Sequence, residues 1–386
     1  TYMQQHDPYS AFRISNYRLY AIGSFITMVT TRIQSMAISW EMYQRTGQAL
    51  ALGLVGLAIA LPTILLALPA GYLADTFNRR KVIILSLLGT TTTSVALAGL
   101  SYIQGTISLM YGLLILDAAF STLGNPARRA LLPQIVPRNV FPNAVTWSNS
   151  IGNIASVLGP AIAGFLVMVY LPMAYLISAV GTLVFIILLM KIDHYSIIPQ
   201  PKKRQPLFQI LFGGLHFLWT TRLLLILMSL DMFAVLLGGA VYLLPIFAED
   251  ILQVGPQGFG WLRTAPAVGA FCTALLLAYL PPMKHAGRNL LLSVAGFGIA
   301  TIIFGLSKSF WISLAMLFLT GVFDNVSMVI RHTLIQLLTP DSMRGRVSAV
   351  NNVFVSASNE LGGLESGLIA HWFNPIISVV SGGIGT

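Results

Sequence analysis

Charged residues are scarce in this chain of 386 residues, where Lys, Arg, Asp and Glu together make up 9% of the sequence. Soluble domains average about 25% charged residues. Hydrophobic residues reach 56% and the mean hydropathy is +0.79. This composition excludes an ordinary soluble domain and indicates an integral membrane protein.

Cysteine is also nearly absent. The single residue, Cys272, excludes an intramolecular disulfide. The six histidines do not cluster, so we expect no metal site. No phosphate-binding loop of the G-x-x-x-x-G-K-[ST] type occurs, which argues against ATP as the energy source, and we expect no cofactor. No nucleophile–base arrangement is visible either, so we expect no enzyme.

What the chain does contain is a series of long apolar runs. Hydropathy predicts an all-α membrane protein with eleven spans and the start of a twelfth, since a span needs about 20 apolar residues. The predicted spans lie near 17–40, 51–73, 82–103, 107–130, 145–169, 171–190, 223–247, 257–280, 289–306, 311–338 and 348–372, then from 374 onward.

The longest polar stretch separates the sixth and seventh spans and predicts the domain boundary. We expect an N-terminal six-helix bundle at 1–190, a cytoplasmic linker at 191–222 and a C-terminal bundle at 223–386. Within the linker, 207–221 reads as an amphipathic helix on the membrane surface. The chain opens without Met and closes on 13 residues after the last full span, so we expect both ends to be incomplete.

Basic residues indicate the orientation. If the N-terminus is cytoplasmic, 17 of the 22 Lys and Arg fall on that side, while only Arg45 and Lys308 fall on the other. This is a strong positive-inside bias. The net charge of +10 therefore reports topology, and no nucleic acid is expected as a partner.

The two halves of the chain repeat. The stretch 128–137 aligns with 331–340 without a gap, and both begin with Arg and end with Pro. The spans near 51–73 and 257–280 share a Gly-x5-Pro pattern. Such a repeat predicts two bundles related by a pseudo-twofold axis along the membrane normal.

The loop 71–80, GYLADTFNRR, lies between two stretches without charge. It resembles the loop between helices 2 and 3 of the major facilitator superfamily, with Asn78 where the family favours glycine. In that reading Gly71 permits close backbone approach and Asp75 pairs with Arg79 across one turn. The resemblance implies conformational gating by Gly71, Asp75, Arg79 and Arg80. The alternative is a basic turn that only sets topology.

Further stretches resemble one branch of this superfamily, the exporters related to the enterobactin exporter and the macrolide-efflux pumps. They are WEMYQRTG at 40–47, PARR at 126–129, QLLTP at 336–340, RGRV at 344–347 and SNELG at 358–362. The branch implies a siderophore or an amphipathic drug-like molecule as the substrate.

The fifth predicted span carries GPAIAG at 159–164, which is similar to the glycine–proline motif of facilitator antiporters. Proline frees a backbone carbonyl, and small neighbours let another helix pack closely. The resemblance assigns conformational gating to Gly159, Pro160 and Gly164. The alternative is an ordinary kinked helix. The arginine that many such antiporters carry in span four has no counterpart, and Asp117 lies in that region instead.

Charges within the spans need a reason, because each costs at least about 2.5–3.5 kcal/mol at mid-membrane. Candidate substrate or coupling residues are Arg32, Asp117, Asp231, Asp324, Arg331 and Glu360. Arg263 and Glu365 are also intramembrane, His332 lies beside Arg331, and the aromatic residues considered for a substrate site are Phe120, Trp147, Phe233, Tyr242 and Phe354.

Depth along the helices groups these charges into two pairs. Arg32 and Asp117 fall at similar height in the outer half, where they form either a buried pair or a substrate contact. Asp231 and Asp324 both fall about 10–12 Å from the inner side. Two nearby carboxylates in a low-dielectric site resist double ionisation, as a proton carrier requires. The alternative is that a neighbour such as Arg331, two turns from Asp324, fixes each acid.

Together these features predict a monomeric secondary transporter in the bacterial inner membrane, surrounded by membrane lipids. We expect a proton gradient to drive export of a small amphipathic molecule by alternating access. A nutrient symporter or a lipid flippase of the same fold is an alternative, and a non-transporting receptor is an alternative from another class.

Overall fold

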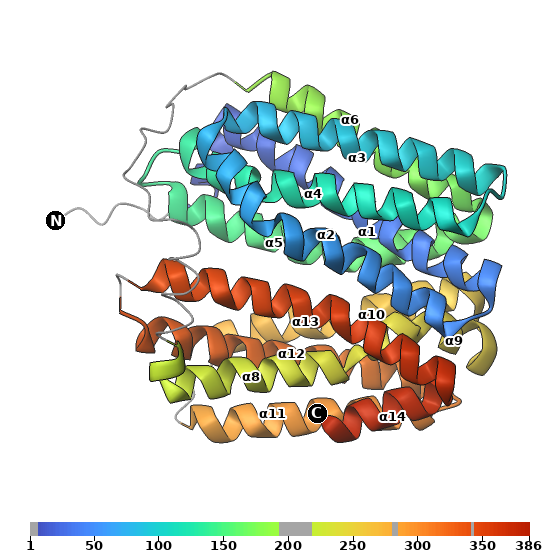
Figure 1. Ribbon diagram of the computed structural model, residues 1–386. Coiled ribbons are helices and arrows are strands. Elements are labelled where there is room, and N and C mark those ends of the chain that lie inside the picture. The colour runs from blue at the N-terminus through green and yellow to red at the C-terminus, as the bar shows by residue number, and fades with distance from the viewer. Residues whose placement is uncertain (1–6, 193–217, 280–284, 341–342) are drawn as a thin grey trace. The chain divides into compact units, whose positions relative to one another are not determined.

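The computed structural model describes residues 7–192, 218–279, 285–340 and 343–386, and throughout these ranges the regular structure is helical. The helices of the first half (Figure 1) are η1 (Ser10–Arg13), α1 (Ser15–Thr46), α2 (Ala49–Thr76), α3 (Arg79–Tyr102), α4 (Ile107–Ile135), α5 (Phe141–Val169) and α6 (Leu171–Met190).

The helices of the second half begin after the predicted linker. They are α8 (Arg222–Leu237), η2 (Gly239–Leu243), α9 (Leu244–Ile246), η3 (Phe247–Ile251), α10 (Gly255–Tyr279), α11 (Ala286–Leu306), α12 (Phe310–Leu338), α13 (Arg344–Trp372) and α14 (Pro375–Gly385). Each predicted span thus has a helical segment at its place. The predicted amphipathic helix at 207–221 lies almost wholly outside the described residues.

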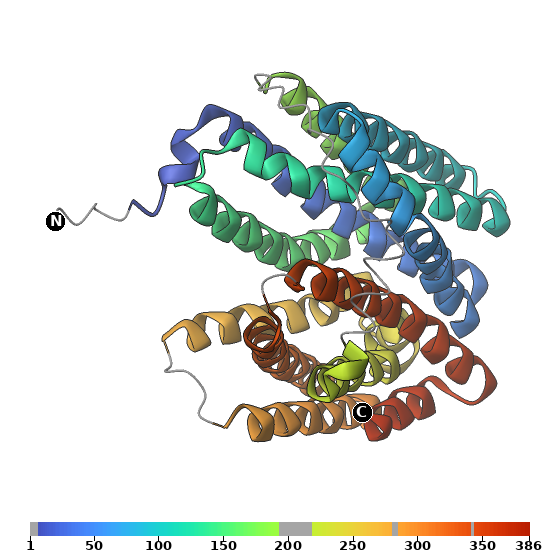
Figure 2. The same cartoon turned by 60° about the vertical axis from the view of Figure 1, so that its left-hand side comes forward.

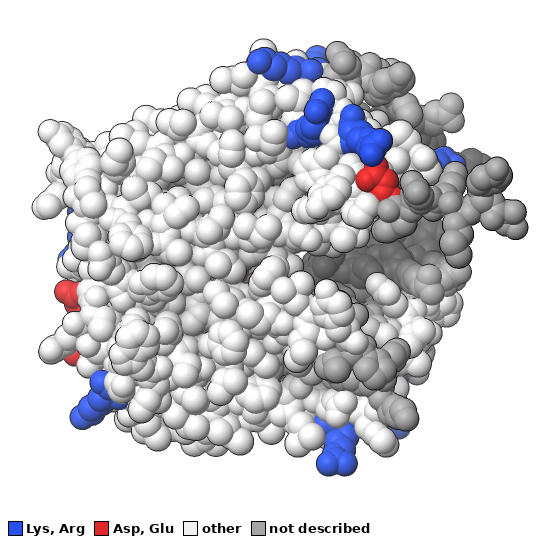
Figure 3. All heavy atoms as spheres, turned by 180° about the vertical axis from the view of Figure 1, so that it is seen from behind, with Lys and Arg blue, Asp and Glu red and all other residues white. Residues whose placement is uncertain are grey.

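Within the described residues, nine helical stretches are long and apolar enough to cross a membrane. Two more, α1 with 32 residues and α13 with 29, have the length but carry more charged and amide side chains. On the face shown in Figure 3, the blue and red atoms lie toward the helix ends and leave a wide white zone between them. This pattern is that of an integral membrane protein.

Contacts group the chain into two compact units. Unit 1 comprises Thr1–Ala37 and Leu65–Lys202, and unit 2 comprises Ile38–Ile64 and Lys203–Thr386. The last nine residues of α1 and the first part of α2, up to Ile64, therefore pack within unit 2. The six-plus-six division read from the sequence stays a prediction.

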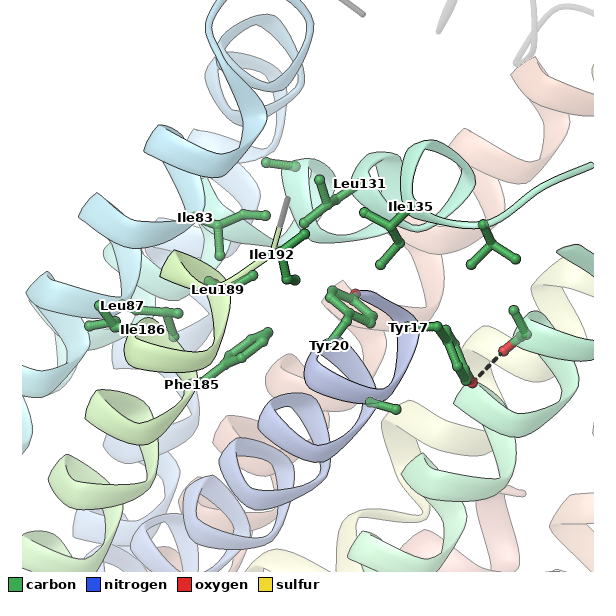
Figure 4. Packing of buried hydrophobic residues seen from close by; sticks show 14 of the residues in the cluster. Tyr17, Tyr20, Ile83, Leu87, Leu131, Ile135, Phe185, Ile186, Leu189 and Ile192 are labelled. Atoms are coloured by element: carbon green, nitrogen blue, oxygen red, sulfur yellow. Dashed lines mark hydrogen bonds between the residues drawn. The ribbon is translucent and has the colours of Figure 1, made fainter. Parts of the chain in front are cut away.

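Unit 1 is organised around α3, which lies against both α4 and α6. A buried cluster joins the first turns of α1 to the ends of α4 and α6, as Figure 4 shows for Tyr17, Leu131 and Leu189. The Tyr17 hydroxyl donates a 3.0 Å hydrogen bond to the Ala144 carbonyl oxygen. This cluster fixes the helix ends that carry the basic residues of unit 1.

In unit 2, α12 lies against α10 and α11, while α13 lies against α8 and α14 (Figure 2). The segment 222–251 is predominantly apolar and changes from α-helix to 3₁₀-helix at Gly239. A Cβ on Gly239 would lie 2.7 Å from the Gly362 carbonyl oxygen. Only glycine permits this approach between the segment and α13.

Candidate functional sites in the two units

A polar cavity of about 390 Å³ lies within unit 1. Helix α4 lines it with Asp117, Ser121, Asn125 and Arg128, whose spacing of four, four and three residues follows one helix face. The other polar residues of the wall are Thr27, Thr31, Arg32, Gln34, Thr90, Ser94, Ser156, Ser178 and Thr182. Hydroxyl and amide groups thus surround two arginines and one carboxylate.

Asp117 is held by uncharged neighbours. The Thr93 hydroxyl donates a 2.6 Å hydrogen bond to Asp117 Oδ1, and Gln34 Nε2 donates one of 3.5 Å to Oδ2. Ser94 in turn donates a 2.7 Å bond to Gln34 Oε1. Among the described residues, Arg32 makes no ion pair with Asp117, so the first of the two alternatives for these residues, a buried pair, does not hold.

Arg32 lies instead at the crossing of α1 and α5. A Cβ added to Gly159 would lie 2.4 Å from Arg32 Cβ and 3.1 Å from the Val29 carbonyl oxygen. The backbone of α5 therefore touches α1, and the close helix packing expected at the glycine–proline motif is present at Gly159. Pro160 and Gly164 are buried in the same helix.

Arg128 occupies the other end of the polar face of α4. Its Nε atom is buried and has no hydrogen-bond partner among the described residues. One turn earlier, a Cβ on Gly124 would lie 2.2 Å from Ser86 Oγ, so α3 and α4 are tightly packed there. The Arg128 carbonyl oxygen accepts a 3.1 Å bond from the Tyr20 hydroxyl. The backbone of Arg128 is fixed while its charge faces the cavity.

The basic loop between α2 and α3 binds helix ends within unit 1. Arg79 Nη1 donates a 2.9 Å bond to the Ala130 carbonyl oxygen, and Arg80 donates to those of Met190 and Ile192. These carbonyls belong to the last turns of α4 and to the end of α6, where a cation is favourable. Asn78 caps α3 by accepting a bond from the Lys81 amide.

Two expectations for this loop change. Nothing lies within 4 Å of a Cβ added to Gly71, so the close backbone approach predicted there is absent among the described residues. Arg79 donates hydrogen bonds to the backbone carbonyls of Ala74 and Ala130 instead of forming the predicted pair with Asp75. The gating role of Gly71, Asp75, Arg79 and Arg80 stays a prediction.

In unit 2, Arg331 of α12 forms an ion pair with Asp231 of α8. The side chains are 9% and 12% exposed, so both charges lie in a largely protein-enclosed environment. Arg331 Nε also donates a 3.3 Å bond to the Ser327 carbonyl oxygen. The alternative that a neighbour such as Arg331 fixes each acid therefore holds for Asp231, whereas Arg331 does not pair with Asp324.

Asp324 shares its surroundings with this pair. A cavity of about 200 Å³ is lined by Asp231, Asp324, Arg331 and His332, and a smaller one of about 20 Å³ by both acids. A third, of about 160 Å³, reaches Asp324 and Tyr242. The two carboxylates thus line common cavities, as their similar depth predicted. Asp324 has no hydrogen-bond or ion-pair partner among the described residues.

The family model described as transmembrane secretion effector matches residues 6–385. The chain belongs to the transmembrane secretion effector family. The enterobactin exporter EntS of Shigella boydii serotype 4 (strain Sb227) is 26% identical over 377 residues, covering 96% of this chain and 88% of the exporter. EntS of Escherichia coli O1:K1 is 25% identical over 374 residues with the same coverage.

Solved structures similar to this secretion effector show its fold. A bacterial homologue of the human lysosomal transporter Spinster gives a TM-score of 0.76 at 16% identity, covering 96% of this chain and 88% of the other. The nucleoside transporter NupG gives 0.75 at 11% identity, with 96% of both chains covered. The secretion effector therefore has the major facilitator fold, and family and fold together make it a membrane transport protein.

The aromatic residues proposed from the sequence separate into several environments in this secretion effector. Trp147 Nε1 donates a 2.8 Å bond to the Pro8 carbonyl oxygen and its ring packs on Tyr9, so it anchors the N-terminal segment. Phe354 packs on a buried cluster of unit 2.

Tyr242 donates a 3.2 Å bond to Glu360 Oε2 and lines the 160 Å³ cavity. Phe120 lies against Gly89 of α3, and Phe233 is exposed.

The remaining intramembrane charges have partners within unit 2. Arg263 Nη1 donates a 2.9 Å bond to the Val241 carbonyl oxygen, and Glu365 accepts one of 3.2 Å from Ser366. No group of three or more His, Cys, Asp or Glu residues that could hold a metal occurs in the described part of the chain.

Sequence reasoning missed one contact cluster within unit 2. It joins the end of α1 and the start of α2 to the rest of that unit. We call it the Tyr43 cluster, and its members are Trp40, Tyr43, Gly53, Asp250, Phe259 and Gly367. The Tyr43 hydroxyl donates a hydrogen bond to Asp250 Oδ2. The Trp40 and Phe259 rings stack at 5.5 Å, and a Cβ on Gly367 would lie 2.6 Å from Gly53 Cα. The available signal was the position of Tyr43 in the family-like stretch 40–47, but its partner lies 207 residues away.

Proposed function

We propose that this chain is a proton-coupled exporter of a small amphipathic molecule in a bacterial inner membrane, with its N-terminus in the cytoplasm. The observation that carries the proposal is the shared cavity of Asp231 and Asp324 beside the buried Asp231–Arg331 ion pair. Export rather than uptake is supported by the family and by the enterobactin exporters among the relatives.

The ion pair and the second acid supply a proton switch. Arg331 lies seven residues from Asp324 on α12, about 10 Å along the helix. Protonation of Asp231 removes the charge that holds Arg331, and Arg331 then turns toward Asp324. A proton and the Arg331 guanidinium thus compete for the two carboxylates. Each exchange changes how α8 and α12 are held together.

Alternating access requires contacts that form in one state and break in the other. Within unit 2, the Tyr43 cluster joins the end of α1 to η3 and α10 and serves as one such contact set. The loop 71–80, which binds the ends of α4 and α6, serves as a second, together with the close α1–α5 packing at Gly159. Glu360, held by Tyr242, lies where α13 meets Gly56 of α2.

The first experiment is an export screen in cells lacking or overproducing the protein. Mass spectrometry of medium and cell extract should find compounds that are enriched outside the overproducing cells and retained by the deletion strain. Compounds enriched inside the overproducing cells would favour a nutrient symporter, and lipids that change leaflet would favour a flippase. Purified protein that binds a compound but moves none into liposomes would favour a receptor.

A further inference from the structure

The cavity of unit 1 holds more positive charge than its own residues neutralise. Its titratable lining consists of Arg32, Asp117 and Arg128. Asp117 is already bound by Thr93 and Gln34. Neither Arg32 nor Arg128 forms an ion pair among the described residues, and the Arg128 Nε has no hydrogen-bond partner at all there.

The internal repeat shows what such an arginine requires. Arg128 of α4 aligns with Arg331 of α12 in the two halves of the chain. In unit 2 the aligned arginine is neutralised by Asp231 of the same unit. In unit 1 the described residues provide no such carboxylate, and the space beside Arg128 is a cavity of about 390 Å³.

A buried guanidinium that lacks its acceptors is unfavourable, and it binds carboxylate and phosphate oxygens in a geometry that matches its donors. The rest of the wall fits the same ligand. Ser121 and Asn125 lie on the face of α4 that carries Arg128, and Thr31 and Ser156 add hydroxyl groups from α1 and α5. These groups donate hydrogen bonds to further oxygens of a bound anion.

We propose that this cavity is an anion site, in which Arg128 and Arg32 bind an oxygen-rich anionic group of the transported molecule. The inference deepens the proposed function and rests on it, because it assigns a negative charge to the substrate of that transporter. Asp117, at the far end of the same helix face, repels a second anion and limits the site to one.

The test is direct binding, which does not depend on transport. Citrate, a small oxygen-rich anion, is titrated into the purified full chain in detergent by calorimetry at constant ionic strength, with inorganic phosphate as a second probe and glycerol as the neutral comparison. We expect citrate to bind and Arg128→Gln or Arg32→Gln to weaken it about tenfold or more. The matched control is Arg129→Gln, which removes the same charge from the adjacent, exposed position and should leave the affinity unchanged.

A second variant, which is expected to tighten binding, distinguishes a specific loss of affinity from misfolding. Asp117→Asn removes the one carboxylate that the described residues contribute to the cavity and should tighten citrate binding several-fold. The same titration in phosphatidylcholine and phosphatidylglycerol nanodiscs identifies the source of the anion, because an anionic headgroup that fills the site weakens citrate binding in phosphatidylglycerol only. Citrate and phosphate that fail to bind the wild type, or that bind Arg128→Gln equally well, would overturn the inference. Binding without any transport would retain the anion site but reject both the proposed exporter and the assignment of the anion to a transported molecule.

Discussion

Asp231 of α8 and Arg331 of α12 form an ion pair in unit 2, and both side chains are almost wholly enclosed by protein. The same cavity wall carries Asp324, to which no described residue donates a hydrogen bond. One acid is therefore neutralised and the other is available. This asymmetry is the structural basis for the proposed coupling.

Breaking the ion pair on one side should destabilise the protein. Arg331→Met or Asp231→Asn alone leaves an uncompensated buried group and is expected to cost about 3–5 kcal/mol, whereas the double variant should cost less than the sum. Thermal unfolding in detergent measures this, with Arg129→Gln as the control for loss of one charge. Single variants as stable as that control would show that the pair contributes nothing.

The crossing of α1 and α5 should not tolerate a larger residue at Gly159. Alanine there overlaps Arg32 Cβ and is expected to cost about 1–3 kcal/mol, and leucine should abolish transport while the protein still inserts. Gly112→Ala on α4 is the matched control, since nothing lies within 4 Å of its added Cβ. Transport and expression level are measured together. Normal transport by Gly159→Leu would remove this argument.

The loop 71–80 should bias the conformational balance. Asp75 lies in the last turn of α2, so the gain of up to about 1 kcal/mol would come from the N-terminus of another helix that it meets in the inward-closed state. Asp75→Asn is therefore expected to leave folding intact and to shift the population toward the inward-open state. Spin-label distances between the cytoplasmic ends of the two halves measure the shift. Arg80→Gln should act through the end of α6, where Arg80 binds two carbonyls. An unchanged distance distribution in Asp75→Asn would contradict the gating role.

The Tyr43 cluster should bias the same balance in the opposite direction. Tyr43→Phe removes the hydrogen bond to Asp250 but keeps the ring, so it should favour the state in which the end of α1 separates from η3. Crosslinking between cysteines at Gln44 and Gln253 reports this contact, with Tyr9→Phe as a control tyrosine at the N-terminal segment. Equal crosslinking yields in Tyr43→Phe and wild type would exclude Tyr43 from the contact set.

The helices could be predicted from the sequence because apolar length and charge placement determine membrane spans. The partners of the intramembrane charges could not. Depth along a helix places Arg32 and Asp117 at one height, but it does not give the rotation about each axis, and Asp117 faces Thr93 instead. Because the sequence does not give the rotation about each helix axis, it also did not predict the pairing of Arg331 with Asp231.

Arg128 is one of the 17 Lys and Arg that the sequence places on the cytoplasmic side, but in the structure it lines the cavity of unit 1. Its spacing from Asp117, Ser121 and Asn125 follows one helix face, which is a signal that the sequence does contain. The Tyr43 cluster had no comparable local signal, since it depends on tertiary contacts between distant segments.

The most direct test of the account is transport into proteoliposomes with an imposed pH gradient, using a substrate found in the export screen. The wild type should concentrate the substrate on the acidic side, as proton antiport requires. Asp231→Asn and Asp324→Asn should lose this accumulation but still exchange substrate at equal pH, while Asp7→Asn, at the N-terminal segment, should behave as wild type. If both cavity variants concentrate the substrate as steeply as the wild type does, Asp231 and Asp324 are not the coupling site.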